Sequence, residues 1–119
     1  MIVIVCGGRE FNDYNLIEST MARELLPGTV VVTGGARGAD YNADLAANRL
    51  GFQRVIFPAN WTQHGKGAGP RRNMMMLSLM KPDLVLAFPG GTGTAHMVRI
   101  ARESGVRVVE ANYGAPAAL

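Results

Sequence analysis

Apolar residues gather in five short runs rich in valine and isoleucine, and longer stretches with apolar residues at helical spacing separate these runs. The runs predict five strands, at Ile2–Cys6, Thr29–Thr33, Arg54–Phe57, Leu84–Phe88 and Arg107–Glu110. The first, second and fourth runs are almost continuously apolar. Such continuity is typical of strands that are covered on both faces of a parallel sheet.

The stretches between the strands predict four helices, at about Tyr14–Leu25, Gly38–Leu50, Pro70–Met80 and Thr94–Ser104. Strand and helix alternate throughout, so right-handed crossovers should join parallel strands. The predicted fold is an α/β, Rossmann-like open parallel sheet of five strands in the order 3-2-1-4-5, with helices on both faces. We expect a single domain over residues 1–111 and a flexible C-terminal tail over residues 112–119, which are rich in alanine, proline and glycine.

Local signals support these boundaries. Asp13 can cap the first helix, and Gly51 and Gly105 follow the second and fourth helices, where a left-handed residue is favoured. The polar connection Pro58–Gly69 has no regular pattern and is expected to be a loop. The side chains of Met74–Met76 are expected to pack against the sheet.

Composition excludes several classes of protein. The chain has 119 residues and no apolar run of the roughly 18 residues that span a membrane. It also begins without the basic leader of a secretion signal. One cysteine and two histidines cannot supply the four ligands of a structural zinc site, and Cys6 is expected to be a small buried apolar residue. We therefore expect a cytoplasmic protein without a bound metal.

The charge is modest overall but uneven along the chain. The formal net charge is +3, and no acidic residue occurs between Asp44 and Asp83. The basic residues in that stretch are Arg49, Arg54, Lys66, Arg71, Arg72 and Lys81. This local excess indicates a surface that faces an anion, although an ordinary solvated face would have the same composition.

Glycine-rich turns follow three of the predicted strands. They are Gly7–Arg9 after the first strand, Gly34–Asp40 after the second and Pro89–Thr94 after the fourth. Ligands of open parallel sheets bind beyond the carboxyl ends of the strands, where these turns should meet. The alternative interpretation is that the glycines only allow sharp connections.

The turn Pro89–Thr94 is the strongest local signal. A helix that begins at about Thr92 or Thr94 would present free N–H groups to a phosphate, and the two hydroxyls could add hydrogen bonds. Two better-known phosphate motifs are absent. Gly65-Lys66 is followed by Gly67, so there is no GxxxxGK[ST] motif, and His96 stands where GxGxxG requires a small residue.

Other polar residues are candidates for the same site. Arg72, with Arg71 and Asn73, should occupy the first turn of the third helix, where a guanidinium can bind a phosphate. Asp40 could bind a ribose hydroxyl or only stabilise its helix dipole. His64 and Lys66 could reach a ligand or face water, and His96 could be only a polar surface residue.

Together these pieces resemble the SLOG superfamily, and most closely its YspA-type branch, which is related to the YpsA proteins. The superfamily includes the "lonely guy" phosphoribohydrolases and DNA-processing protein A. The resemblance runs nearly the whole length of the chain and rests on Gly8–Asp13, Gly35–Asp40, Trp61 with His64–Lys66, Ala68–Asn73 and Pro89–Thr94. It implies a Rossmann-like sheet, a dimer and a pocket for nucleotide-derived molecules. It also implies a bacterial or phage source, and a phage-encoded protein would act in the cytoplasm of the host.

One position departs from the hydrolases in this superfamily. Their turn continues as PGGxGTxxE, and Met97 replaces the glutamate here. A thioether cannot act as a base, so the same cleavage of an N-glycosidic bond is not expected.

The leading hypothesis is binding or sensing of a nucleoside phosphate or a ligand of ADP-ribose or NAD type, with no cofactor required. One alternative is an enzyme that acts at the ribose or phosphate through Asp40, Glu10 or His64. Single-stranded nucleic acid is a weaker alternative, because aromatic residues make up only 7% of the chain. The expected ligand-binding residues are Gly8, Arg9, Gly34, Gly35, Gly38, Asp40, His64, Lys66, Arg72, Asn73, Pro89, Gly90, Gly91, Thr92, Gly93 and Thr94.

Overall fold

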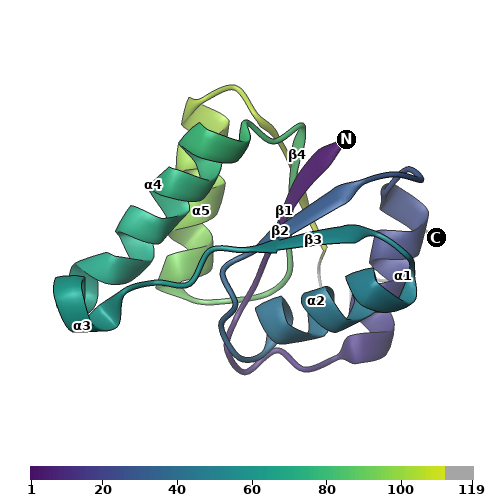
Figure 1. Cartoon of the computed structure of the whole chain (residues 1–119), viewed down its shortest axis with the longest axis horizontal. Coiled ribbons are helices and arrows are strands. Elements are labelled where there is room, and N and C mark those ends of the chain that lie inside the picture. The colour runs from purple at the N-terminus through teal and green to yellow at the C-terminus, as the bar shows by residue number, and fades with distance from the viewer. Residues whose placement is uncertain (112–119) are drawn as a thin grey trace.

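The computed structural model describes residues 1–111 and contains the predicted parallel sheet (Figure 1). Its five strands lie in the order β3-β2-β1-β4-β5, and all neighbouring pairs are parallel. Their bounds are β1 Ile2–Cys6, β2 Val30–Thr33, β3 Gln53–Ile56, β4 Leu84–Ala87 and β5 Arg107–Glu110. The predicted fold class and strand order are confirmed. The predicted tail at residues 112–119 lies outside the described residues.

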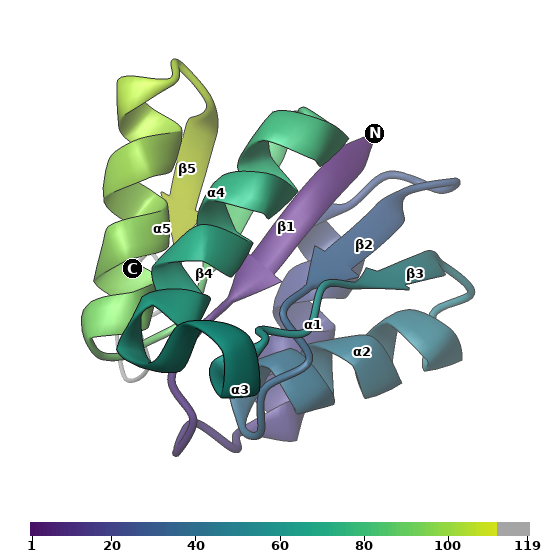
Figure 2. The ribbon, with the colours of Figure 1, turned by 60° about the vertical axis from the view of Figure 1, so that its left-hand side comes forward.

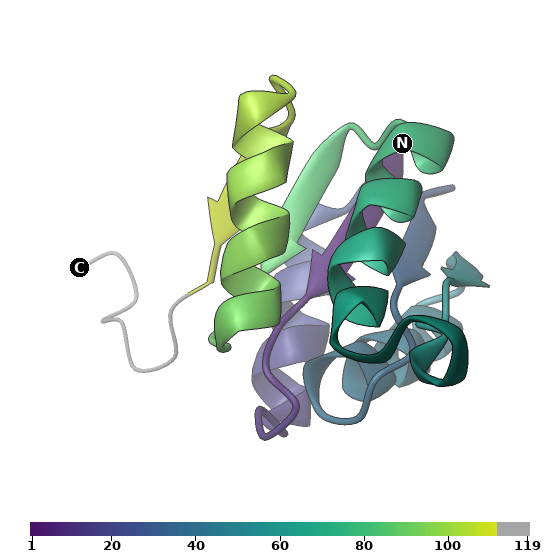
Figure 3. The ribbon, with the colours of Figure 1, turned by 90° about the vertical axis from the view of Figure 1, so that its left-hand side faces the viewer.

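Helices cover both faces of the sheet. Helices α1 (Tyr14–Glu24) and α2 (Ala39–Arg49) lie on one face, and α4 (Ala68–Met80) and α5 (Thr92–Glu103) lie on the other (Figure 1). Figure 3 shows α4 and α5 side by side in front of the sheet. Within residues 1–111, no helix combines the length and the apolar character needed to cross a membrane.

The core has one layer on each face of the sheet, because successive side chains of a strand point to opposite sides. Val3 and Val5 of β1 pack with Ile17 and Met21 of α1 and with the alanine-rich face of α2. Ile4 and Cys6 of the same strand belong to the opposite layer, which includes Met76 of α4 and Met97 of α5. The continuous apolar run of β1 is therefore explained by burial on both faces.

The strand ends differ slightly from the prediction. Thr29 was expected in β2, but its amide and its hydroxyl both donate to the carbonyl oxygen of Leu26, at 3.2 and 2.6 Å. These bonds hold Thr29 in the preceding turn. The expected caps are present: the Asp13 carboxylate accepts from the amide of Leu16 at 3.0 Å, and Gly51 and Gly105 have φ values of 80° and 77°.

The predicted loop at residues 58–69 was wrong in part. It contains the short helix α3 (Trp61–His64) and a 3-10 turn, η1 (Gly65–Gly67), and α4 begins at Ala68. The side chain of Asn60 caps α3 by accepting from the amide of Gln63 at 3.0 Å. Because α4 begins at Ala68, Arg71 ends its first turn, and Arg72 and Asn73 lie in the second turn and not in the first as predicted.

The expectation for the methionines was also wrong in part. Met76 is buried among the side chains beneath α4, but Met74 and Met75 are 58% and 52% exposed. Three consecutive residues point in directions about 100° apart around a helix, so they cannot all face one sheet.

Candidate functional site

Backbone hydrogen bonds join the three glycine-rich turns at the carboxyl edge of the sheet. The amide of Gly8 donates to the carbonyl oxygen of Pro89 at 2.8 Å, and the carbonyl oxygen of Gly8 accepts from the amide of Ala39 at 3.0 Å. The turn after β1 is thus fixed to the turn after β4 and to the start of α2. This is the switch point of the sheet, where ligands of such folds bind.

The fold itself, without any ligand, requires glycine at some of these positions. A Cβ atom on Gly90 would lie 2.2 Å from the Thr94 hydroxyl oxygen and 2.6 Å from the Gly8 amide nitrogen. Gly38 has a φ of 80°, and a Cβ there would lie 2.4 Å from the carbonyl oxygens of Gly8 and Arg9. Neither position leaves room for a side chain.

A cleft of about 680 Å³ opens beside these turns, on the side of α4 and α5. Figure 2 shows α3 beside the beginning of α4, at the end of the sheet to which the β1 arrow points. The cleft is lined by residues after β1 and β2, by α3, η1 and α4, and by the start of α5. Its volume lies in the usual range of pockets for small ligands.

The first turn of α5 forms one wall of the cleft. Its N-cap residue is Gly91, and no side chain caps the helix. Among the described residues, the amides of Thr92, Gly93 and Thr94 have no hydrogen-bond acceptor, whereas the amide of Ala95 donates to Gly91. A Cβ atom on Gly91 or Gly93 would meet no other atom within 4 Å, so packing does not require glycine at either position.

Arg72 joins α4 to the ends of β2 and β3. Its Nη1 donates to the carbonyl oxygens of Gly34 at 2.7 Å and Phe57 at 3.3 Å, and its Nε donates to Oδ1 of Asn73 at 3.1 Å. Nη2 has no hydrogen-bond acceptor within residues 1–111, and Arg72 is one of the residues that line the cleft. Burial lowers the pKa of Arg72, and nearby Asp40 opposes that change.

Asn73 lies beside Arg72 and connects α4 to α5. Its Nδ2 donates to the carbonyl oxygen of Gly93 at 3.2 Å and contacts Nδ1 of His96 at 3.1 Å. Asn73 is 5% exposed, so these bonds satisfy a buried amide. His96 also lines the cleft, and burial together with nearby Arg99 lowers its pKa.

Asp40 is the carboxylate that lines the cleft. It is 6% exposed and accepts from the amide of Ala36 at 3.2 Å. Burial raises the pKa of Asp40, although the bond from Ala36 and the charge of Arg72 favour its ionised form. Cys6 is buried, as predicted, and its burial raises the pKa of the thiol to about 12.

The cleft has an excess of positive charge. Arg9, Lys66 and Arg72 line it together with the single carboxylate of Asp40, which leaves a formal charge of +2. No acidic residue lies in the first turn of α5. Only Lys66 and Arg72 come from the basic stretch noted in the sequence, because residues such as Arg54, which pairs with Asp44 at 3.1 Å, lie elsewhere.

The structure brings most of the expected binding residues to this cleft. Those that line it are Gly8, Arg9, Gly34, Asp40, Lys66, Arg72, Asn73, Gly91, Thr92, Gly93 and Thr94. Gly35, Gly38 and His64 do not line it, and neither does Glu10, which pairs with Arg37 at the surface. Among the residues proposed for catalysis, only Asp40 therefore reaches the cleft.

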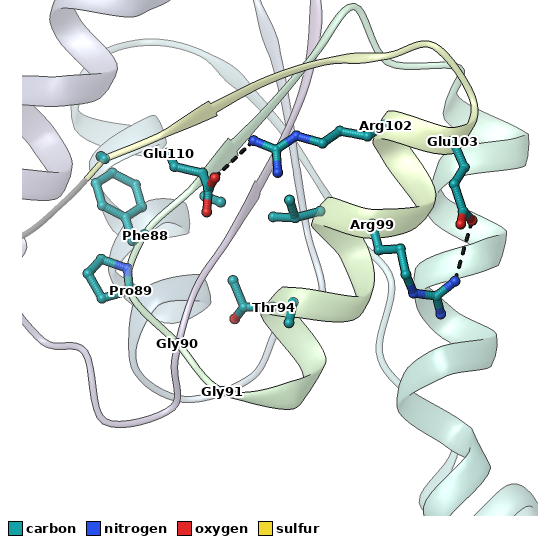
Figure 4. Close-up of a pocket in the computed structure, with 13 residues that line it drawn as sticks. Phe88, Pro89, Gly90, Gly91, Thr94, Arg99, Arg102, Glu103 and Glu110 are labelled. Atoms are coloured by element: carbon teal, nitrogen blue, oxygen red, sulfur yellow. Dashed lines mark hydrogen bonds and ion pairs between the residues drawn. The ribbon is translucent and has the colours of Figure 1, made fainter.

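Pro89 and Gly90 line a second cleft of about 660 Å³, on the other side of the same turn (Figure 4). Its charged side chains are paired with one another. Arg99 lies 3.4 Å from Glu103, and Arg102 lies 2.9 Å from Glu110, as the dashed lines in Figure 4 show. Because these charges balance, the second cleft is less suited to an anion than the first.

Several residues that line the first cleft were not among the expected ligands, and two of them, Trp61 and His96, carry aromatic rings. Trp61 is 48% exposed and lines the cleft from α3, and His96 lines it from α5. A lone tryptophan in a polar connection was the available signal for Trp61. His96 follows the turn Pro89–Thr94 closely, but its direction depends on the exact start of the helix.

Met97 lies in the core and not in the cleft, with 1% of its surface exposed. Across residues 1–111, no group of three or more histidine, cysteine, aspartate or glutamate side chains is placed to hold a metal ion.

Comparison with known proteins identifies relatives of this chain. The family model YAcAr, described as the YspA, cpYpsA-related SLOG family, matches residues 1–64. The Gene 61 protein of Mycobacterium phage D29 is 39% identical over 122 aligned positions, which cover 94% of this chain and 95% of that protein.

Two solved structures share the fold. The structural-genomics target TM1055 has a TM-score of 0.68 and 20% identity, and the match covers 90% of this chain and 71% of that chain. The molybdenum cofactor binding protein from the phototrophic bacterium Rippkaea orientalis has a TM-score of 0.69 and 24% identity, and the match covers 94% of this chain and 76% of that chain. The family model spans more than half of the chain and the phage relative spans nearly all of it, so the chain belongs to the YspA, cpYpsA-related SLOG family.

Proposed function

We propose that this protein binds a small phosphorylated ligand of nucleotide type, with a phosphate at the N-terminus of α5. The observation that carries this proposal is the set of free amides of Thr92, Gly93 and Thr94, which open on a positively charged cleft. Free N–H groups and the helix dipole both favour an anion at this place. The open space at Gly91 and Gly93 would let phosphate oxygens approach the backbone closely.

Two side chains add donors to this site. Nη2 of Arg72 is a charged donor whose other nitrogens are already fixed by carbonyl groups, so it is held in position before the ligand arrives. His96 lines the same cleft and can donate from its second ring nitrogen. Charged donors that are fixed in advance bind phosphate more strongly than neutral or mobile ones.

A second candidate function is an enzyme that acts at the ribose or phosphate of such a ligand. Asp40 favours this candidate, because it is a buried carboxylate with a raised pKa that lines the cleft. Buried carboxylates of this kind are common among general acids and bases. Binding without turnover remains the preferred proposal, since Met97 replaces the glutamate of the phosphoribohydrolases.

The fold comparison is compatible with binding of a small molecule, as one structure with this fold is named a molybdenum cofactor binding protein. We expect the protein to act in the cytoplasm, that of the host if a phage encodes it, and to form a dimer. The large apolar side chains exposed on α4 are Met74, Met75 and Leu79, and they provide the face on which dimer formation should be tested.

The test is a thermal-shift screen of the native protein against inorganic phosphate, ribose 5-phosphate, the four nucleoside monophosphates, ADP-ribose and NAD. A ligand present at about 100 times its Kd should stabilise the fold by roughly 2.7 kcal/mol. Mass spectrometry of each mixture then reports any product. The proposal fails if no phosphorylated compound raises the melting temperature. A strong fall in affinity with salt for oligonucleotides, without binding of mononucleotides, would favour single-stranded nucleic acid.

A further inference from the structure

Trp61 lines the same cleft and is unusually exposed for so large a residue. It is the only tryptophan of the chain, and 48% of its surface is exposed. Tryptophan on a protein surface is favourable where a partner covers its flat apolar face. The exposed part of the Trp61 side chain is therefore accessible to a partner.

Trp61 begins a capped helix, and its ring lies beside the start of α4. Asn60 caps α3, the helix that Trp61 begins, and its Nδ2 also donates to Oε1 of Gln63 at 3.1 Å. At the start of α4, a Cβ atom on Gly69 would lie only 3.5 Å from the far edge of the Trp61 ring. Trp61 and Gly69 both line the cleft, so the ring forms part of its wall.

Arg9 also lines the cleft and lies over the Trp61 ring. Its guanidinium carbon lies 5.1 Å from the centre of the Trp61 ring, in a cation–π contact. Arg9 is exposed, and no carboxylate of residues 1–111 lies within ion-pair distance of it. Its planar group can therefore turn away from the ring and close again over a flat molecule without breaking an ion pair.

We propose that Trp61 and Arg9 form a clamp for a planar ring of the ligand, so that the ring stacks on Trp61 and the Arg9 guanidinium closes over it. This inference rests on the proposed function and extends it, because it assigns the ligand to compounds that carry a nucleobase together with a phosphate. Ribose phosphates without a base would lack the stacking contact. Purines have larger flat surfaces than pyrimidines and should bind more tightly.

The first test uses Trp61 as its own reporter. Addition of AMP to the native protein should change the tryptophan emission, whereas ribose 5-phosphate and inorganic phosphate should bind without that change. AMP should bind more tightly than ribose 5-phosphate by about 5-fold to 150-fold, the range measured for stacking of one base on an aromatic side chain. Equal affinities and an unchanged emission would overturn the clamp while leaving phosphate binding in place.

The second test compares Trp61→Leu with Trp61→Phe by calorimetry. Trp61→Leu should reduce the affinity for AMP to that for ribose 5-phosphate and leave the latter unchanged, and Trp61→Phe should retain most of the AMP affinity. Tyr41 is 63% exposed and does not line the cleft, so Tyr41→Leu is the matched control with native affinities. A Trp61→Leu protein that binds AMP like the native protein would overturn the clamp. If that variant does not fold, Trp61→Phe and the native emission decide the question. If no phosphorylated compound binds the native protein, the clamp and the proposed function both fail.

Discussion

Nδ2 of Asn73 lies 3.1 Å from Nδ1 of His96 and fixes the tautomer of that histidine. The amide of Asn73 cannot be reversed, because its Oδ1 accepts from Nε of Arg72 and its Nδ2 donates to the carbonyl oxygen of Gly93. Nδ1 of His96 must then accept, which places the proton of the neutral ring on Nε2. A buried amide thereby prepares a donor at the cleft before any ligand arrives.

The first prediction concerns the protonation of His96. Burial and the charge of Arg99 lower its pKa from the ordinary value of 6.5, and protonated Nδ1 would also face the Asn73 donor. Because the unfolded chain binds this proton more readily, His96 should reduce stability as the pH falls below about 6.5. NMR titration of the ring nitrogens should show the Nε2–H form at neutral pH and an apparent pKa below the ordinary value.

Asn73→Asp is the matched variant for this measurement. A carboxylate has no hydrogen to donate and favours a positive ring, so the pKa of His96 should rise and the proton should move to Nδ1. A His64→Gln protein assigns the two histidine signals. An Nδ1–H form in the native protein would contradict the arrangement.

The second prediction concerns Asp40. Burial raises its pKa above the ordinary 3.8, so the folded state holds this proton more tightly than the unfolded chain does. Its contribution is therefore fully present below about pH 3.8 and is lost as the pH rises through the folded pKa. Asp40→Asn can still accept from the Ala36 amide and is neutral, so its melting temperature should rise relative to that of the native protein as the pH increases above about 3.8. A gain that reverses with rising pH would mean that Arg72 dominates over burial.

The fold was readable from the sequence because its signals are local. The valine and isoleucine runs, the cap at Asp13 and the glycines at 51 and 105 each depend on a few neighbouring residues. The approximate location of the site was readable for the same reason, since the carboxyl ends of parallel strands must meet at one edge.

The finer features were not readable because they depend on contacts across the fold. Nothing near Arg72 in the sequence indicates that it donates to the carbonyl oxygens of Gly34 and Phe57. Likewise, Gly90 and Gly91 are adjacent and identical, yet only Gly90 is confined by Thr94 and Gly8. Helix α4 also begins earlier than predicted, because the Asn60 cap and the turn Gly65–Gly67 bring the chain into the helix before Pro70.

The third prediction concerns catalysis. The native protein should release no free base from nucleoside monophosphates, and loss of an acid–base group usually costs a factor of about 10²–10⁴ in rate.

Introducing the missing carboxylate should not restore the reaction, since Met97 is 1% exposed and packs in an apolar layer. Met97→Glu should lower the free energy of unfolding by roughly 3–5 kcal/mol, against less than about 1.5 kcal/mol for Met97→Leu. Turnover near once per second by the native protein would overturn the binding proposal.

The fourth prediction compares two adjacent glycines. Gly90→Val should disrupt the fold, because its Cβ would overlap Thr94 and the Gly8 amide. Gly91→Val places its side chain in open space at a φ of −98°, so the protein should fold with a loss of about 1 kcal/mol or less at the N-cap. The same side chain should block phosphate binding at α5. Circular dichroism and urea unfolding measure the first effect, and the thermal shift with ligand measures the second. A folded Gly91→Val protein with native affinity would place the phosphate elsewhere.

The last prediction separates stability from binding at one position. Gly93 is the second residue of α5, and neither its backbone angles nor its neighbours require glycine. Alanine in a helix is more favourable than glycine by roughly 0.5–1 kcal/mol, so Gly93→Ala should unfold at a higher urea concentration than the native protein. The added methyl group would occupy the space that a phosphate needs beside the free amides, so affinity for phosphorylated ligands should fall. A variant that is more stable and binds with native affinity would show that ligand binding does not require glycine at position 93. Arg72 and Lys66 would then be the residues to test for phosphate binding.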